Sequence, residues 1–281
     1  MPTIALLANA ESGSGEAAEV AATLKDLGAE AQEFGLDQIE DAITSGPDRI
    51  AVAGGDGSLA RVAAAINTAH GPPLAVIPTG TANDFARALA IPGDLREACA
   101  LAVSGTKTRR LDLAWMDERP FLNVASVGLP PAAARRASGL KGMLGPLAYV
   151  VGAIGAGLGS KPVRCVVTCG GVEVFAGKAW QVTVACSGAF GGGASVDTDP
   201  DDGRLEVVVI KAGSRIRLAL HGVALRTGDI ADREGVLKHT CKTARIDFDG
   251  ERSFNVDGEI TSHGSPDFRL EPGAFDVVIG A

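Results

Sequence analysis

Two short turns in this sequence carry groups that could hold and transfer a phosphoryl group. The first is Gly-Gly-Asp-Gly-Ser at residues 54–58, between an apolar run at residues 50–53 and an amphipathic run at residues 59–66. Glycines let backbone N–H groups approach phosphate oxygens, and a helix start adds partial positive charge. Asp56, which we expect in an exposed turn, could hold magnesium or accept a proton. The alternative is a ligand-free tight turn with a helix N-cap.

The second turn is Pro-Thr-Gly-Thr-Ala-Asn-Asp-Phe at residues 78–85, which follows the apolar run at residues 74–77. The two threonines and Asn83 can hydrogen-bond a nucleotide, and Asp84 brings a second carboxylate. A helix start at Asn-Asp without a ligand is the alternative here. Because both turns follow apolar strand-like runs, we expect them side by side at the carboxyl edge of one parallel sheet.

The elements around these turns alternate between strand and helix patterns. Continuous apolar runs at residues 4–8, 50–53 and 74–77 are typical of strands buried on both faces. Helical patterns follow each of them, and another occupies residues 36–46. This succession predicts a doubly wound parallel α/β domain with its ligand at the strand carboxyl ends.

The pattern changes after about residue 120, where short β runs separated by glycine-rich turns dominate. They predict a mainly antiparallel β domain with helices near residues 143–158 and 214–226. The last β run, at residues 275–279, could return to the first domain. We therefore predict one domain from residues 1–119 and 270–281 and a second from residues 120–269. The β runs of the second domain are at residues 163–169, 172–176, 181–186, 205–210 and 244–248.

The charge balance disfavours a nucleic-acid partner. The 281 residues include 34 acidic and 26 basic side chains, giving a net charge of −8, whereas a nucleic-acid binder normally carries a basic footprint. A local basic cluster at Arg135, Arg136 and Lys141 is either a solvated face or a membrane or substrate patch.

The cysteines and the hydrophobic runs favour a soluble cytoplasmic protein. Five scattered cysteines in apolar surroundings are typical of buried thiols in a reducing compartment, although Cys165, Cys169, His239 and Cys241 could form a zinc site. The N-terminus has no signal-peptide pattern, and the most hydrophobic run, residues 143–158, is too short to span a bilayer. The sequence leaves open a homodimer and a peripheral attachment to the inner membrane face.

The two turns together resemble the diacylglycerol kinase catalytic-domain family, which includes soluble bacterial diacylglycerol kinases and the sphingosine and ceramide kinases. The resemblance extends over nearly the whole chain. Residues 9–15 look like the family's Asn-Pro-x-Ser-Gly opening, with Ala10 in place of proline. Residues 201–205 resemble its Asp-Gly-x-Leu segment, and residues 255–259 resemble its Asp-Gly-Glu segment.

This resemblance implies an ATP- and Mg²⁺-dependent lipid kinase that transfers the γ-phosphate to a lipid hydroxyl. The acceptor would be of the diacylglycerol type, with ceramide, a sphingoid base and phosphatidylglycerol left open. It also implies an ATP-binding α/β domain like those of NAD kinase and phosphofructokinase, a lipid-binding β-sandwich, and an active site between them. Carboxylates, Mg²⁺ and a phosphate cradle are the parts that phosphoryl transfer needs.

The resemblance also implies roles for particular residues. Glu259 would be the first choice as general base and Asp56 the second, with Asp84 and Asp257 beside them around magnesium. A structural magnesium would bind the Asp202 carboxylate and the backbone carbonyls of Asp199 and Arg204. The residues implied to contact ATP are Asn9, Ser12, Gly13, Gly54, Gly55, Asp56, Gly57, Ser58, Thr79, Gly80, Thr81 and Asn83.

Two departures from the family pattern leave the acceptor lipid open. Residues 59–61 are Leu-Ala-Arg where many lipid kinases have a glutamate, and residues 186–188 are Cys-Ser-Gly where Asn-Gly is usual. An NAD kinase or phosphofructokinase relative would share Gly-Gly-Asp-Gly, but residues 78–85 argue against both. A dinucleotide dehydrogenase lacks support because no G-x-G-x-x-G opens the first helix. A non-catalytic lipid or nucleotide binder has no need of four clustered carboxylates.

Overall fold

The computed structural model describes residues 1–8, 14–129, 161–187, 189–190, 194–195, 199–214 and 235–280. The chain forms two compact units, Met1–Leu113 with Glu271–Ala281, and Ala114–Leu270. It leaves the first unit within β5 (Lys107–Met116) and re-enters it within β17 (Asp267–Ile279). The predicted helix near residues 143–158 and most of the one near 214–226 lie outside the described residues. So do Asn9, Ser12, Gly13 and the basic cluster of Arg135, Arg136 and Lys141.

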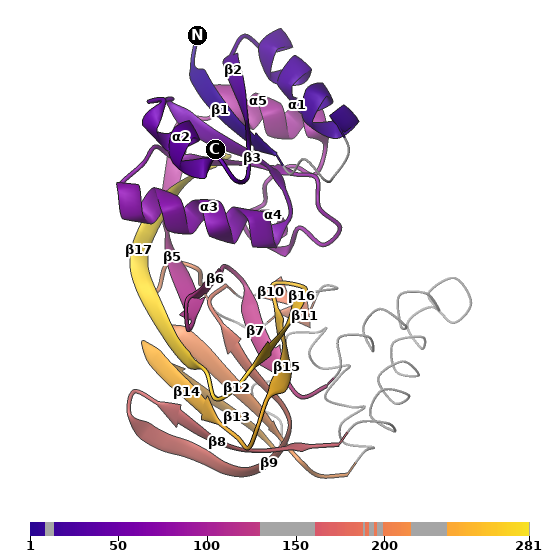
Figure 1. Cartoon of the computed structure of the whole chain (residues 1–281), viewed down its shortest axis with the longest axis vertical. Coiled ribbons are helices and arrows are strands. Elements are labelled where there is room, and N and C mark those ends of the chain that lie inside the picture. The colour runs from indigo at the N-terminus through magenta and orange to yellow at the C-terminus, as the bar shows by residue number, and fades with distance from the viewer. Residues whose placement is uncertain are drawn as a thin grey trace, which may run out of the picture. The chain divides into compact units, whose positions relative to one another are not determined.

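The first unit is built on a parallel sheet with helices on both faces, as predicted (Figure 1). Its strand order is β2-β1-β3-β4-β17, and the pairings of β1 with β2, of β1 with β3, of β3 with β4 and of β4 with β17 are parallel. The central strands are buried on both faces, which explains their continuous apolar runs. The strands are β1 (Thr3–Ala8), β2 (Glu30–Gly35), β3 (Arg49–Gly54) and β4 (Leu74–Pro78).

The longer helices of this unit bury apolar residues against the sheet and one another. Val20 and Leu24 of α1 and Cys99 of α5 pack with Leu6 and Ile77 in one core cluster. Asp94 caps α5, because its side chain accepts the backbone N–H of Glu97 at 3.0 Å. The helices are α1 (Ser14–Asp26), α2 (Ile39–Thr44), α3 (Asp56–Ala69), α4 (Asp84–Ala88) and α5 (Leu95–Ser104).

The second unit is a mainly antiparallel β structure, also as predicted (Figure 1). Its strands follow the order β16-β15-β7-β9-β8-β14-β17, β12 and β13 extend from β9, and the β5–β6 hairpin joins β17. Phe121, Phe254 and Phe268 meet in its core. Its strands are β6 (Arg119–Phe121), β7 (Val124–Val127), β8 (Val163–Cys169), β9 (Val172–Ala185), β10 (Ala189–Phe190), β11 (Ala194–Ser195), β12 (Leu205–Lys211), β13 (Val236–Cys241), β14 (Thr243–Asp247), β15 (Arg252–Val256) and β16 (Glu259–His263).

Several elements differ from the sequence prediction, and three of them show why. The edge strand β2 was not predicted because its sequence is largely polar and exposed. The helix expected from residue 36 begins only at Ile39. The two strands predicted at residues 172–176 and 181–186 are one strand, β9, which continues through Gly177 at a φ of 157°. Within the described residues, no helix is long and apolar enough to cross a membrane.

Candidate functional site

The two glycine-containing turns lie side by side, as the sequence predicts. Strands β3 and β4 pair in parallel with Gly54 opposite Pro78, so both turns leave the same edge of the sheet. A Cβ atom on Gly80 would lie only 2.6 Å from the Cα of Gly55, so the backbones of the two turns are in close contact. This approach requires glycine at position 80, and it brings the second turn against the residue that precedes α3.

Asp56 joins the two turns through hydrogen bonds. It is the first residue of α3 and is 5% exposed, so the expectation of an exposed position is wrong. Its Oδ2 accepts the backbone N–H of Asp84 at 3.1 Å, and its Oδ1 accepts that of Phe85 at 3.0 Å. These are N–H groups of the first turn of α4, which has no carbonyl partners for them. Asp56 therefore caps α4 from another helix, which excludes its carboxylate from bulk water.

The second turn is shaped by Asn83 and Asp84. Asn83 adopts a left-handed conformation with a φ of 49°, and its Nδ2 donates to the Gly80 carbonyl at 2.7 Å. Asp84 is buried, and its carboxylate pairs with the Arg87 guanidinium one helical turn later. Thr81 is exposed on the same turn. The turn therefore presents a hydroxyl to solvent from a backbone that its own side chains hold in place.

Asp257, in the second unit, has a carboxylate that binds the backbone. Its Oδ2 accepts the N–H of Leu122 at 2.7 Å, and its Oδ1 accepts those of Asn123 at 3.0 Å and Val124 at 2.9 Å. Its own N–H donates to the carbonyl of Val124 at 3.0 Å. Its φ is 46°, so it forms a left-handed turn before Gly258. Asp257 thus fixes the β15–β16 turn to the segment between β6 and β7.

Glu259, two residues later, is placed differently. It begins β16, its side chain is 62% exposed, and its Oε2 accepts a hydrogen bond from the Arg119 guanidinium of β6. Glu259 is therefore the exposed carboxylate of the Asp-Gly-Glu segment, whereas Asp257 is the one engaged with backbone.

Cys186 and Ser187, which depart from the family pattern, contact Asn123, in the segment that Asp257 also binds. The backbone N–H of Cys186 donates to the carbonyl of Asn123 at 2.9 Å, and the buried hydroxyl of Ser187 donates to the Asn123 side chain at 2.8 Å. The third residue of the departure, at position 188, lies outside the described residues. Asn123 is thus held on both sides, by Asp257 and by the Cys186–Ser187 pair.

The residues expected to bind a structural magnesium form one turn. The N–H of Asp202 donates to the Asp199 carbonyl at 3.4 Å, and the Asp202 Oδ1 accepts the N–H of Arg204 at 2.9 Å. The carboxylate and the two carbonyls implied as ligands are hard oxygen donors of the kind Mg²⁺ prefers. Within the described chain, no three acidic, histidine or cysteine side chains are grouped closely enough to hold a metal ion.

Three charged residues of the two units were not identified from the sequence. Asp112 is buried, and its Oδ1 accepts the N–H of Gly273 at 2.8 Å; its lone charge in the apolar run of β5 could have pointed to it. Arg87 is three residues after Asp84, a spacing that predicts a helical ion pair. Arg119 had no such local pattern, because its partner Glu259 is far away in sequence.

The cysteines are free thiols, and two of them interact. A hydrogen bond between Cys169 and Cys241 raises the pKa of Cys169, which is also raised by burial. The same hydrogen bond lowers the pKa of Cys241, and backbone N–H groups of Gly170 and Thr243 lower it further. This pair lies at the ends of β8 and β13, in the second unit.

Comparison with protein families and known proteins gives consistent matches. Residues 3–116 match the model of the diacylglycerol kinase catalytic domain, and residues 123–279 match the YegS C-terminal NAD kinase beta sandwich-like domain. A protein named diacylglycerol kinase from Staphylococcus aureus strain JH9 is 29% identical over 247 residues, which cover 84% of this chain and 78% of that protein.

Two solved structures resemble the whole chain. A crystal structure described as a diacylglycerol kinase from Bacillus anthracis strain Sterne aligns with a TM-score of 0.77 at 22% identity, covering 99% of this chain and 97% of the other. Yeast NADH kinase complexed with NADH aligns with a TM-score of 0.54 at 12% identity, covering 100% and 84%. At these identities, both likenesses show the fold alone.

Proposed function

The chain belongs to the diacylglycerol kinase catalytic-domain family, and we propose that it transfers the γ-phosphate of ATP to a hydroxyl group of a diacylglycerol-type lipid. The Staphylococcus aureus relative carries the name diacylglycerol kinase, which supports this acceptor class at 29% identity. Ceramide, a sphingoid base and phosphatidylglycerol are the other lipid acceptors to be compared. The lipid would be taken from a membrane surface.

The observation that carries this proposal is the contact between the two turns after β3 and β4. Gly55 and Gly80 bring two backbone segments together at the N-terminus of the 14-residue helix α3. Backbone N–H groups at such a place bind phosphate oxygens, and the helix dipole adds partial positive charge. We infer that the triphosphate of ATP binds here, along residues 54–58 and 79–83, and that the exposed hydroxyl of Thr81 contacts it.

The carboxylates divide into positioning groups and one candidate base. Both oxygens of Asp56 accept backbone N–H groups, so Asp56 is suited to hold the second turn rather than to accept a substrate proton. Asp257 likewise holds the backbone of its own unit. Glu259 is the exposed member, and we assign it the removal of the proton from the lipid hydroxyl during attack on the γ-phosphorus.

Magnesium is the metal that this chemistry calls for, because it neutralises charge on the phosphate oxygens. Oxygen donors of the kind that Mg²⁺ prefers are present in the turn of Asp199, Asp202 and Arg204. A hydrogen bond from the Arg204 N–H orients the carboxylate of Asp202 in this turn. We assign a structural ion to that turn. We assign Asp84 as the candidate ligand for a magnesium ion bound to the nucleotide. Its carboxylate forms an ion pair with Arg87 in the structure.

An acceptor panel tests the proposal. Purified protein is incubated with γ-labelled ATP, magnesium and vesicles that contain each lipid in turn, with NAD and a sugar phosphate as non-lipid acceptors. We expect label on diacylglycerol above all other acceptors. Label on NAD or the sugar phosphate alone would instead support the NAD kinase or phosphofructokinase alternative, and no label on any acceptor would support a non-catalytic binder.

A further inference from the structure

Strand β16 is tied to the β5–β6 hairpin at both of its ends. At the first residue, the Arg119 guanidinium hydrogen-bonds the Glu259 carboxylate. At the last residue, the Nδ1 of His263 lies 3.3 Å from the Oδ2 of Asp117. Among the described strands, β16 pairs with β15 only, so it is an edge strand that its sheet holds from one side. Two side-chain pairs, the hairpin contacts, hold it in addition, through residues that share one strand face.

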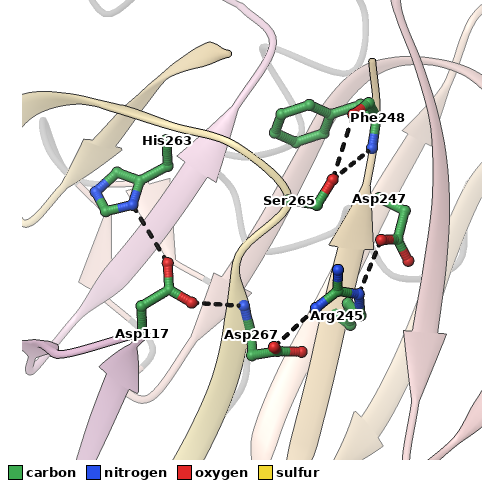
Figure 2. A network of polar contacts seen from close by, with 7 residues as sticks. All are labelled: Asp117, Arg245, Asp247, Phe248, His263, Ser265 and Asp267. Carbon is green, nitrogen blue, oxygen red and sulfur yellow. Dashed lines mark hydrogen bonds and ion pairs between the residues drawn. The ribbon is translucent and has the colours of Figure 1, made fainter. Parts of the chain in front are cut away.

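Asp117, the hairpin residue that faces His263, is held by a hydrogen bond from Asp267 of β17, as Figure 2 shows. The Oδ1 of Asp117 accepts the N–H of Asp267 at 3.0 Å, and the N–H of Asp117 donates to the Asp267 carbonyl at 2.8 Å. The Asp267 carboxylate in turn pairs with Arg245 at 2.7 Å, and Arg245 also pairs with Asp247. The backbone hydrogen bond from Asp267 therefore orients the Asp117 carboxylate, whose side chain is 45% exposed, with its other oxygen toward His263.

The imidazole of His263 is also constrained on its other sides. Its Nε2 lies 3.2 Å from the hydroxyl of Thr261, on the same strand face as Glu259. The ring meets Phe254 edge-on, with centroids 6.1 Å apart. Phe254 is fully buried and contacts Phe268 in the core. His263 thus connects β16 to the hydrophobic core as well as to the hairpin.

We propose that Arg119 and His263 are positioning residues that hold β16, and with it Glu259, in the orientation needed for proton removal. This inference rests on the proposed function, in which Glu259 is the base. The Glu259 and Arg119 side chains are 62% and 31% exposed, and exposed ion pairs contribute little to folding stability. Their effect would therefore fall on orientation at the reacting group, where a displacement of about 1 Å can cost roughly a hundredfold in rate.

Four variants test this inference. Arg119→Gln and His263→Ala each remove one of the hairpin contacts, and Asp117→Asn keeps the acceptor for the Asp267 N–H while removing the charge that faces His263. We expect each to lower kcat by about tenfold or more with KM for ATP unchanged. Arg119→Lys keeps a cation and should recover part of the loss. Arg164→Gln on β8 and Asp249→Asn in the β14–β15 turn are matched exposed controls that should behave as the wild type.

Hydrogen exchange of the β16 backbone separates this inference from the proposed function. Faster exchange of amides 259–263 in Arg119→Gln, His263→Ala and Asp117→Asn, with no change in the controls, would support the hairpin contacts. Unchanged exchange would overturn the inference, and so would an unchanged or raised kcat. If the wild-type protein phosphorylates no acceptor, the proposed function fails. The role in catalysis then fails with it, and exchange alone decides whether the hairpin contacts hold β16.

Discussion

The backbone N–H of Asp84 donates a hydrogen bond of 3.1 Å to the carboxylate of Asp56, which is 28 residues earlier in the chain. A second bond from Phe85 to the same carboxylate makes Asp56 the cap of α4. The aspartate of the Gly-Gly-Asp-Gly segment thus holds the turn that follows the neighbouring strand. This relationship gives Asp56 a role in structure as well as in the candidate active site.

Asp56→Ala should therefore destabilise the protein, because two buried N–H groups lose their acceptor. Hydrogen bonds to a charged group contribute about 1.5–3 kcal/mol each, so for two bonds we expect a loss of about 3–6 kcal/mol in the free energy of unfolding. Asp56→Asn keeps one acceptor oxygen and should lose less. Urea denaturation measures both, with exposed Asp249→Ala as the control. If Asp56→Ala has the same free energy of unfolding as the wild type, the carboxylate does not cap α4.

Gly80→Ala should separate the two turns. The added Cβ would lie 2.6 Å from the Gly55 Cα and 2.8 Å from the Asn83 Oδ1, so backbone must move to make room. We expect kcat/KM for ATP to fall on the order of a hundredfold. Gly93→Ala is the matched control, since a Cβ there meets nothing within 4 Å. Equal ATP kinetics in the two variants would contradict the assignment of this contact as the phosphate site.

Asp257→Ala should act mainly on stability. The variant leaves the N–H groups of Leu122, Asn123 and Val124 without their acceptor, and we expect a loss of about 2–4 kcal/mol in the free energy of unfolding. Asp257→Asn replaces one acceptor oxygen with a donor and should also be destabilised. Thermal denaturation in parallel with the wild type checks both. Wild-type stability in Asp257→Ala would contradict this structural role and favour Asp257 as a direct magnesium ligand.

Glu259→Gln should act on turnover and not on stability. Its side chain is exposed and its ion pair with Arg119 is open to solvent, so its removal costs little in folding. Loss of a general base typically lowers rate by a factor of about 10²–10⁴. We expect a drop in kcat of this size, with ATP affinity preserved. Steady-state kinetics over an ATP series measures it, and an undiminished kcat would remove Glu259 from the role of base.

Thiol chemistry should distinguish the cysteines by their pKa values. Burial raises the pKa of Cys99 and of Cys165 to about 11, whereas the hydrogen bond with Cys169 lowers the pKa of Cys241. Because the thiolate is the reactive form, iodoacetamide should label Cys241 first as pH rises from neutral. Cys169→Ala removes the hydrogen bond and should move this labelling to higher pH. Peptide mass spectrometry follows each site, and first labelling at Cys99 or Cys165 would contradict this order.

The arrangement of the first unit was predictable because its strands are buried on both faces. The apolar runs of β3 and β4, each followed by a glycine-containing turn and a helix, suffice to place both turns on one edge of the sheet. Edge strand β2 was not predictable in this way, since its exposed polar residues have no period that marks a strand. The burial of Asp56 could not be predicted from its own segment, because it depends on hydrogen bonds to α4, which follows the neighbouring strand β4.

In the second unit, the family resemblance pointed to the Asp-Gly-Glu segment but not to the hydrogen-bond partners of its two carboxylates. Asp257 accepts three N–H groups from a segment more than 130 residues away in sequence, and Glu259 pairs with Arg119, which is 140 residues away. Such partners follow from strand register and turn geometry, which a local pattern does not contain. The continuous strand β9 was predicted as two because Gly177 interrupts its apolar pattern.

The most direct measurement of the kinase assignment is the transfer of label from γ-labelled ATP to diacylglycerol in mixed vesicles with magnesium. The wild-type protein should produce labelled lipid at a rate proportional to enzyme concentration. Glu259→Gln and Gly80→Ala should produce it far more slowly, and Gly93→Ala at the wild-type rate. A wild-type protein that labels no lipid, or equal labelling by all four proteins, would contradict it.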